Sequence, residues 1–401
     1  MRSEVAPPPL EGSCFLLNPT FARMNRPTLH GLCIQASQPL LSPATLAGEE
    51  RLDDASARFV VRSRQTTEEI IQGRDDRLLL VVGPCSIHDP AAAREYARLL
   101  HDAATRYASE LFLVMRTYVE KPRSILGWKG LLTDPALDGS NRVNEGLRLA
   151  RKLMVDLAGL RVPVATEFLD PLLAPFLADL VTWGAIGART TESQVHRALA
   201  SGLGLPVGFK NRTDGDVRVA VEALVVARHP HWFASLNGEG VPAMLNSTGN
   251  PCCHLVLRGG SHGPNYGAEH VRAAVAALHA AGLSPRLMVD CSHGNSRRDP
   301  SRQSLVAADV GAQIAAGTRA ICGLMLESNL TAGAQELRTR PLAYGCSVTD
   351  PCLAWDQTLP LLGQLAAAVQ ARRMHGHWLS IAVGDPIVAR PPALAGTGAA
   401  A

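Results

Sequence analysis

The sequence predicts an α/β protein built as a single (β/α)8 TIM barrel with an N-terminal extension and a small inserted hairpin. Three observations support this prediction. Short strand-like segments alternate with helical ones, they are apolar almost throughout, and most end in a cysteine, a histidine or a charged residue. Strands of a parallel barrel are covered by helices and bring their C-terminal ends to one face, where enzymes of this architecture keep their chemistry. The pattern therefore favours an enzyme.

Eight segments have the character of barrel strands. In chain order they are residues 78–85, 111–118, 162–169, 182–188, 206–211, 253–260, 287–295 and 320–328. The stretch 232–252 interrupts the alternation with turn-forming residues. Such an interruption between strand-like runs predicts an inserted hairpin.

Helix boundaries agree with this alternation. Asp89 followed by Pro90 predicts an N-cap and a first helical residue, because an aspartate oxygen accepts free backbone N–H groups and proline needs no N–H partner there. Thr191 with Gln194 has the spacing of a capping box, and Gly202 is a predicted helix end.

The length of the chain is compatible with one elaborated barrel. A chain of 401 residues with 46% hydrophobic content can hold a barrel of ~250 residues with extensions. We expect the barrel to be a catalytic domain spanning residues 38–375. Residues 1–37 lack clear periodicity and are expected to form a loosely ordered extension, and residues 376–401 a flexible tail.

Charge and cysteine usage exclude several classes of protein. Lys and Arg number 39 against 36 Asp and Glu, and this small excess argues against a surface for nucleic acid. Nine cysteines, an odd number without a regular framework, indicate reduced thiols and a cytoplasmic location. No apolar run approaches the ~20 residues of a membrane-spanning helix, so no membrane association is expected.

Basic residues collect after several of the predicted strands. The segment 115–130 contains Arg116, Lys121, Arg123 and Lys129. Taken alone, such a run is also typical of a solvated surface. Arg189, Lys210 and Arg258 each follow a different strand and would converge on the same mouth. Like charges held together need an anion, and guanidinium and ammonium groups suit phosphate and carboxylate oxygens, which predicts a phosphorylated, carboxylated metabolite.

A second set of residues combines metal-binding side chains at strand ends and beyond. Its members are Cys85, His293, Glu327 and Asp350. Thiolate, imidazole and carboxylate ligands together favour one divalent ion of Mn, Fe, Co or Zn over Ca or Mg. Taken singly, the cysteine could be a core residue, the glutamate a surface carboxylate and the aspartate a turn residue. Asp290 is better placed to orient a neighbouring group than to bind the metal.

Two common enzyme classes are poor alternatives. The sequence has no G-x-S-x-G motif and no G-x-G-x-x-G after a strand, which argues against serine hydrolysis and dinucleotide redox chemistry.

A set of longer motifs resembles one enzyme family. The motifs are GPCSIHDP, MRTYVEKPRS, GWKG, TEFLDP, WGAIGARTTESQVHR, GFKN, LRGG, DCSHGNS, LES and YGCSVTDPC. In this order they resemble the microbial type I family of 3-deoxy-D-arabino-heptulosonate 7-phosphate (DAHP) synthases, over about residues 38–375. The resemblance implies a (β/α)8 barrel that condenses phosphoenolpyruvate with erythrose 4-phosphate in the first step of the shikimate pathway.

The resemblance also implies a role for each candidate residue. It implies that the metal ligands are Cys85, His293, Glu327 and Asp350. It implies that phosphoenolpyruvate is bound by Arg116, Lys121, Arg189, Lys210 and Arg258, and erythrose 4-phosphate by Lys121, Pro122, Arg123 and Ser124. The catalytic residues would be Lys121, Glu167 and His293. Ser124 stands where the family pattern has threonine, which keeps the hydroxyl and removes a methyl group.

Two alternatives remain open from the sequence. The chain could be a related synthase that joins phosphoenolpyruvate to a different aldose phosphate, or a catalytically silent regulatory paralogue. The family also leads us to expect a homodimer or homotetramer and feedback inhibition by an aromatic amino acid of unspecified identity.

Overall fold

Eight parallel strands close into a barrel in this computed structural model, which describes residues 33–34, 36–338 and 341–375. The strands are β1 (Leu78–Gly83), β2 (Leu111–Arg116), β3 (Val164–Glu167), β4 (Trp183–Ile186), β5 (Val207–Lys210), β8 (Cys253–Leu257), β9 (Leu287–Asp290) and β10 (Ile321–Asn329). Each pairs with its neighbour, and β10 pairs back onto β1. The predicted barrel is therefore confirmed, with all eight predicted segments among its strands.

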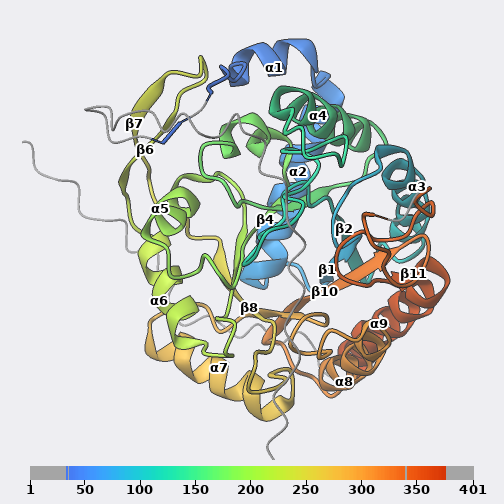
Figure 1. Ribbon diagram of the computed structural model, residues 1–401. Coiled ribbons are helices and arrows are strands. Elements are labelled where there is room, and N and C mark those ends of the chain that lie inside the picture. Colours follow the sequence, from blue (N-terminus) through green and yellow to red (C-terminus); the bar gives the residue numbers. More distant parts are fainter. Residues whose placement is uncertain (1–32, 35, 339–340, 376–401) are drawn as a thin grey trace, which may run out of the picture. The chain divides into compact units, whose positions relative to one another are not determined.

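Helices surround the strands (Figure 1). Those that follow barrel strands are α3 (Pro90–Arg106), α4 (Val143–Gly159), α5 (Gln194–Gly202), α6 (Arg218–Ala227), α7 (Ala268–Ala280), α8 (Gln303–Ala315) and α9 (Trp355–His375). Two more, α1 (Pro43–Glu49) and α2 (Asp54–Gln72), precede the barrel. A short strand, β11 (Leu353–Ala354), pairs with the end of β10, and a 3₁₀ turn, η4 (Pro300–Arg302), leads into α8. In the described residues, no helix is long and apolar enough to cross a membrane.

The connection from β3 to β4 differs from the other crossovers. It contains two 3₁₀ turns, η2 (Ala174–Phe176) and η3 (Ala178–Leu180), in place of an α-helix. Pro175 lies within the first of these turns and lacks the N–H that a continuing helix would need.

The inserted hairpin is present as predicted. β6 (Trp232–Leu236) and β7 (Pro242–Asn246) form an antiparallel pair apart from the barrel sheet. It leaves the barrel after α6, and its turn accepts a hydrogen bond of 2.8 Å from Ala44 N of α1 to Gly238 O.

Two buried layers explain why the strands are apolar throughout. In β1, Leu78, Leu80 and Val82 belong to the layer between strands and helices, whereas Leu79 and Val81 belong to the layer inside the barrel. Both faces of the strand are thus covered, as expected for a parallel barrel.

Two predicted helix boundaries are confirmed and one is wrong. Asp89 caps α3 by accepting a hydrogen bond of 2.8 Å from Ala91 N. At α5 the cap is Ser193, whose hydroxyl accepts from His196 N, while Thr191 belongs to the preceding turn and hydrogen-bonds Gly187 O through its backbone N–H. Gln194 is thus the first helical residue, and the capping box predicted from Thr191 does not form. The helix ends at Gly202, as predicted.

Contacts divide the chain into Met1–Pro39 and Leu40–Ala401, and the barrel lies in the second unit. In the first unit, the described residues 33–34 and 36–39 are exposed and form neither helix nor strand. The remainder of the predicted extension and the tail 376–401 lie outside the described residues, so the domain limits 1–37, 38–375 and 376–401 stay predictions.

Candidate active site

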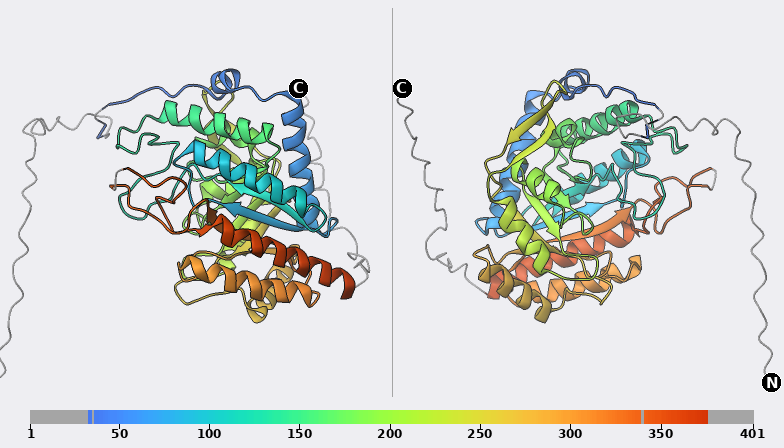
Figure 2. Two further views of the ribbon diagram at one scale, coloured as in Figure 1. Left: turned by 90° about the vertical axis from the view of Figure 1, so that its right-hand side faces the viewer. Right: turned by 60° about the vertical axis from the view of Figure 1, so that its left-hand side comes forward.

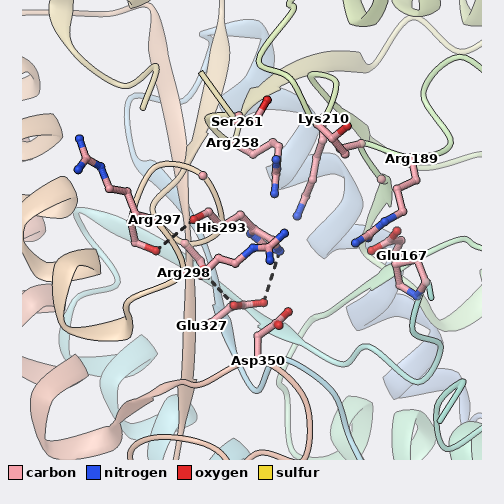
Figure 3. Close-up of a pocket in the computed structure, with 18 of the residues that line it drawn as sticks. Glu167, Arg189, Lys210, Arg258, Ser261, His293, Arg297, Arg298, Glu327 and Asp350 are labelled. Carbon is pink, nitrogen blue, oxygen red and sulfur yellow. Dashed lines mark hydrogen bonds and ion pairs between the residues drawn. The ribbon is translucent and has the colours of Figure 1, made fainter. Parts of the chain in front are cut away.

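A cavity of about 560 Å³ opens at the C-terminal ends of the barrel strands. The predicted site residues that line it are Arg116, Lys121, Pro122, Arg123, Glu167, Arg189, Lys210, Arg258, His293, Glu327 and Asp350. Figure 3 shows Lys210 and Arg258 pointing into the same space. The two other predicted residues adjoin the lining. Cys85 Sγ lies 3.1 Å from Lys121 Nζ, and Ser124 Oγ accepts a hydrogen bond of 2.8 Å from Arg189 Nε.

Strand alternation explains how these side chains reach the cavity. Successive side chains of a strand point to opposite faces, so an interior position continues every second residue. Interior Val114 is followed by Arg116, interior Met325 by Glu327, and interior Val256 by Arg258. The polar residues are therefore the last inward positions of strands that are otherwise apolar inside the barrel. Figure 2 shows the long segments after β2 and β10 at the same end of the barrel.

Three donor atoms form a compact group at one side of the cavity. The thiol of Cys85 and the carboxylates of Glu327 and Asp350 offer atoms that all lie within 4.8 Å of one another. The mixture of a soft thiol and hard carboxylates matches the ligand preferences of Mn, Fe, Co and Zn. His293, the fourth predicted ligand, lies beside this group, with Nε2 3.8 Å from Glu327 Oε1.

Register holds two of these donors together. The closing pair of strands sets Gly83 of β1 opposite Glu327 of β10, so Cys85 emerges two residues beyond Gly83 next to that carboxylate. Asp350 reaches the same place from the segment between β10 and β11, and its Oδ2 lies 3.5 Å from Cys85 Sγ.

Arg116 is fully buried and has several partners. One terminal nitrogen lies 3.0 Å from Glu327 Oε1, and its Nε lies 3.3 Å from Pro84 O. The guanidinium carbon lies 4.0 Å from the centre of the Tyr118 ring. These contacts fix the plane of the guanidinium group before any substrate arrives.

Neighbouring charges set the ionisation of this corner. Burial disfavours the charged form of Glu327, but His293 and Arg116 outweigh it and hold the pKa of that carboxyl below its usual value. Burial raises the pKa of the Cys85 thiol to about 11, and the charge of Glu327 adds to the rise. The glutamate is therefore ionised at neutral pH, while the free thiol keeps its proton.

Lys121 lies over the thiol. Its ammonium group donates to Cys85 Sγ and to Cys85 O, both at 3.1 Å, and the residue is 8% exposed. Burial lowers the pKa of Lys121, but its interactions with Cys85 and with the carboxylate of Glu327 more than compensate and raise it. Lys121 is thus a charged proton donor at the wall of the cavity.

Glu167 depends on a glycine beside it. It is the last residue of β3 and lies close to Gly187, which follows β4. A Cβ at position 187 would lie 2.2 Å from Glu167 Oε1, so a larger residue there would force this carboxylate to move from its present position. The local sequence therefore reserves space for Glu167 in the cavity wall.

Several lining residues were missed as site residues in the sequence prediction. Examples are Tyr118, Ser292 and Arg298. The signal for Tyr118 is its position two residues after Arg116, which continues the inward alternation. Arg298 is exposed and has φ 62°, and no local pattern distinguishes it from a surface arginine. In Figure 3 it points toward the other labelled side chains, whereas Arg297 points away from them.

A parallel barrel that gathers buried cations and a thiol–carboxylate group at its C-terminal face defines an enzyme of the (β/α)8 class with a site for a small anion. The profile of the DAHP synthetase I family matches residues 58–362. The chain belongs to this family.

Individual proteins agree with the family match. The chain is 50% identical over 343 residues to phospho-2-dehydro-3-deoxyheptonate aldolase, Phe-sensitive, of Escherichia coli (strain K12), covering 85% of this chain and 98% of the relative. It is 50% identical over 336 residues to the Trp-sensitive form of the same organism, covering 84% and 96%. A solved phospho-2-dehydro-3-deoxyheptonate aldolase from Francisella tularensis has a TM-score of 0.84 at 48% identity and covers 85% of this chain and 99% of that one. A further similar protein, from Schizosaccharomyces pombe, is named tyrosine-inhibited.

Proposed function

We propose that this chain is a DAHP synthase, which joins phosphoenolpyruvate and erythrose 4-phosphate with water and releases inorganic phosphate. The observation that carries the proposal is the pocket itself, where five cationic residues, three of them buried, one half-buried and one exposed, adjoin a thiol–carboxylate group. This pairing matches the needs of the reaction. One substrate is a carboxylated phosphate ester, and the other is an aldehyde that must be activated.

The cations bind and orient phosphoenolpyruvate. They are Arg116, Lys121, Arg189, Lys210 and Arg258. Their fixed charges compensate the phosphate and carboxylate of the substrate and leave its C3 carbon facing the aldehyde. Holding the two reacting carbons in contact lowers the entropic part of the barrier.

The loop after β2 binds the second substrate. Arg123 and Ser124 are exposed at the mouth, Pro122 lines the cavity, and Lys121 lies deeper. The phosphate of erythrose 4-phosphate is expected at the exposed end and its aldehyde near Lys121. The carbon–carbon bond then forms between C3 of phosphoenolpyruvate and the aldehyde carbon.

A divalent metal ion completes the site in this proposal. Cys85, His293, Glu327 and Asp350 would hold it, and it would supply Lewis-acid polarisation of the aldehyde. The donor chemistry of these residues fits such an ion of Mn, Fe, Co or Zn, and the ionised Glu327 is ready to bind it.

Proton and water handling fall to residues of the chain. Lys121 Nζ is placed to hold or deliver a proton at the aldehyde oxygen. Attack through C3 leaves positive character at C2, which water quenches before the carbon–oxygen bond to phosphate breaks. We assign Glu167 to the positioning of this water. We also assign His293 as a catalytic residue at the reacting centre.

An assay of phosphate release tests the proposal. Phosphoenolpyruvate consumption with erythrose 4-phosphate should be rapid, should stop after treatment with EDTA, and should return when Mn²⁺ is added. A panel of four- and five-carbon aldose phosphates separates this activity from that of a synthase with another aldehyde. A chain that consumes no phosphoenolpyruvate with any metal or aldehyde would be the silent paralogue, and the proposal would be wrong.

Feedback inhibition by an aromatic amino acid is part of the proposal, supported by relatives named Phe-sensitive, Trp-sensitive and tyrosine-inhibited. Titration of the activity with phenylalanine, tyrosine and tryptophan identifies the effector. A homodimer or homotetramer and a cytoplasmic location stay predictions, which sedimentation and cell fractionation would test.

A further inference from the structure

One oxygen of Asp290 has two nitrogen atoms beside it. Lys210 Nζ donates to Oδ2 at 2.9 Å, and His293 Nδ1 lies 2.9 Å from the same atom. The other oxygen, Oδ1, accepts a hydrogen bond of 3.0 Å from Ser292 N. Asp290 is 0% exposed, so these groups take the place of water around it.

The contact with Asp290 orients the His293 ring. Among the described residues, His293 Nδ1 has no aligned hydrogen bond, and Asp290 Oδ2 is the polar atom beside it. The backbone of His293 has φ 55°, a left-handed conformation that is uncommon for residues other than glycine. With Nδ1 next to Asp290 Oδ2, Nε2 faces Glu327 Oε1 and the group of donor atoms.

The contact with Asp290 also holds the ammonium group of Lys210. This lysine is 4% exposed and is the last residue of β5. In the proposed function it binds phosphoenolpyruvate, so an arriving anion competes with Asp290 for its ammonium group. Any shift of Lys210 toward the substrate leaves the shared oxygen more available to His293.

We infer that Asp290 is a positioning residue that couples the metal half of the site to the phosphoenolpyruvate half through this shared oxygen. The inference rests on the proposed function, because it needs a metal at His293 and an anion at Lys210. A carboxylate that accepts from the second nitrogen of a ligand histidine fixes the ring and strengthens the ligand. Coupling of two sites is reciprocal, so phosphoenolpyruvate should strengthen metal binding as much as the metal strengthens substrate binding.

The test measures Mn²⁺ affinity by calorimetry with and without phosphoenolpyruvate, in the parent and in Asp290→Asn. Asparagine keeps the size of the side chain and removes its charge. We expect Mn²⁺ affinity to fall by about 10- to 100-fold. We also expect the factor by which phosphoenolpyruvate increases Mn²⁺ affinity to fall toward one in this variant. If the variant keeps the parental Mn²⁺ affinity and the parental strengthening, the inference is overturned.

A second comparison covers the case in which Asp290→Asn does not fold. Lys210→Met removes one of the two partners of the shared oxygen, and Arg258→Met removes a cation of the same pocket that donates to Gly259 O. Without phosphoenolpyruvate, Mn²⁺ should bind more tightly to Lys210→Met than to Arg258→Met, because only the first substitution releases Asp290 to His293. Equal Mn²⁺ affinities in the two variants would overturn the inference.

The parent protein separates this inference from the proposed function. If the parent neither binds Mn²⁺ nor consumes phosphoenolpyruvate, the proposed function fails and the inference fails with it. If the parent does both while the Asp290 and Lys210 variants show no selective change, only the inference fails.

Discussion

The floor and the rim of the pocket both contain arginine, but they hold their charged side chains in different surroundings. We define the floor as Arg116, Lys121, Lys210, Asp290 and Glu327, all of which are buried. We define the rim as Arg123, Ser124, Arg189, Arg297 and Arg298, all of which are exposed. Floor charges are paired within the protein, whereas rim cations face solvent with few fixed contacts. The floor side chains are therefore held in fixed positions, and the rim side chains are free to move.

Burial explains the difference. A charge removed from water needs several partners at good distances, because isolated charges are costly in a medium of low dielectric constant. Arg116 meets this need with Glu327, with backbone oxygens and with the face of Tyr118. Arg123 makes one hydrogen bond of 2.8 Å to Trp128 O and stays hydrated. Substitutions on the floor should consequently reduce turnover and stability much more than substitutions on the rim.

The largest expected effect concerns catalysis by the floor. Lys121→Ala removes the ammonium group that lies 3.1 Å from Cys85 Sγ, and turnover should fall by about 10²- to 10⁴-fold. Lys129→Ala, an exposed residue of the same loop, should leave turnover close to the parental value. Phosphate release measured at saturating substrate compares the two variants. Near-normal turnover in Lys121→Ala would remove the catalytic role of this lysine.

The next effect concerns stability. Arg116→Met leaves Glu327 buried without its closest arginine partner, and the free energy of unfolding should drop by about 3–5 kcal/mol. Arg123→Met on the rim should change it by less than about 0.5 kcal/mol. Urea-induced unfolding followed by circular dichroism measures both. Equal losses in the two variants would erase the distinction between floor and rim.

Glu120 is a buried carboxyl group that accepts hydrogen bonds from backbone N–H groups. It accepts from Leu169 N at 3.5 Å and from Asp170 N at 3.3 Å, and burial raises its pKa to about 8. A raised pKa gives stability that is full below the unfolded value of 4.5 and is lost as the pH rises through 8.

Glu120→Gln should therefore flatten the pH dependence of unfolding. Between about pH 5 and 8, the parent should lose up to about 1.4 kcal/mol per pH unit more than the variant. Urea midpoints measured at several pH values compare the two slopes. Parallel slopes would mean that Glu120 is ionised in the folded protein.

The smallest effect concerns the rim. Ser124→Ala removes the hydrogen bond from Arg189, which is worth about 1 kcal/mol at most and corresponds to about a fivefold rise in KM. Ser124→Thr keeps the hydroxyl and should stay close to the parental KM. Steady-state kinetics with erythrose 4-phosphate compares the two. A loss in the alanine variant as large as that of Lys121→Ala would place Ser124 with the floor.

Much of the architecture could be predicted because it depends on patterns within short stretches of the sequence. Apolar runs with polar ends mark strands buried on both faces, and Asp89 with Pro90 marks a helix start. Ends of elements were less accurate, since the segment predicted over 287–295 leaves the sheet at Asp290. After this residue the chain turns back, and Asn295 Nδ2 donates to Asp290 O at 2.8 Å.

The features that could not be predicted depend on pairs of residues distant in the sequence. The shared oxygen of Asp290 requires β5 and β9 to be on nearby walls of one barrel, with Lys210 and His293 both turned inward. The stacking of Tyr118 on Arg116 depends on side-chain orientation, although the spacing of two residues was a hint. Ser193 and not Thr191 is the cap because the helix begins only at Gln194, and Thr191 lies in the preceding turn, where its N–H donates to Gly187 O, a contact that a local motif does not reveal.

The pairing of β1 with β10 has a consequence for how the molecule matures. Cys85 is made early during translation, whereas Glu327 and Asp350 leave the ribosome only near the end, so a nascent chain holds one donor without the others. Closure of Gly83 against Glu327 is the event that brings Cys85 next to Glu327. A polypeptide that ends before β10 therefore cannot assemble this group of donor atoms.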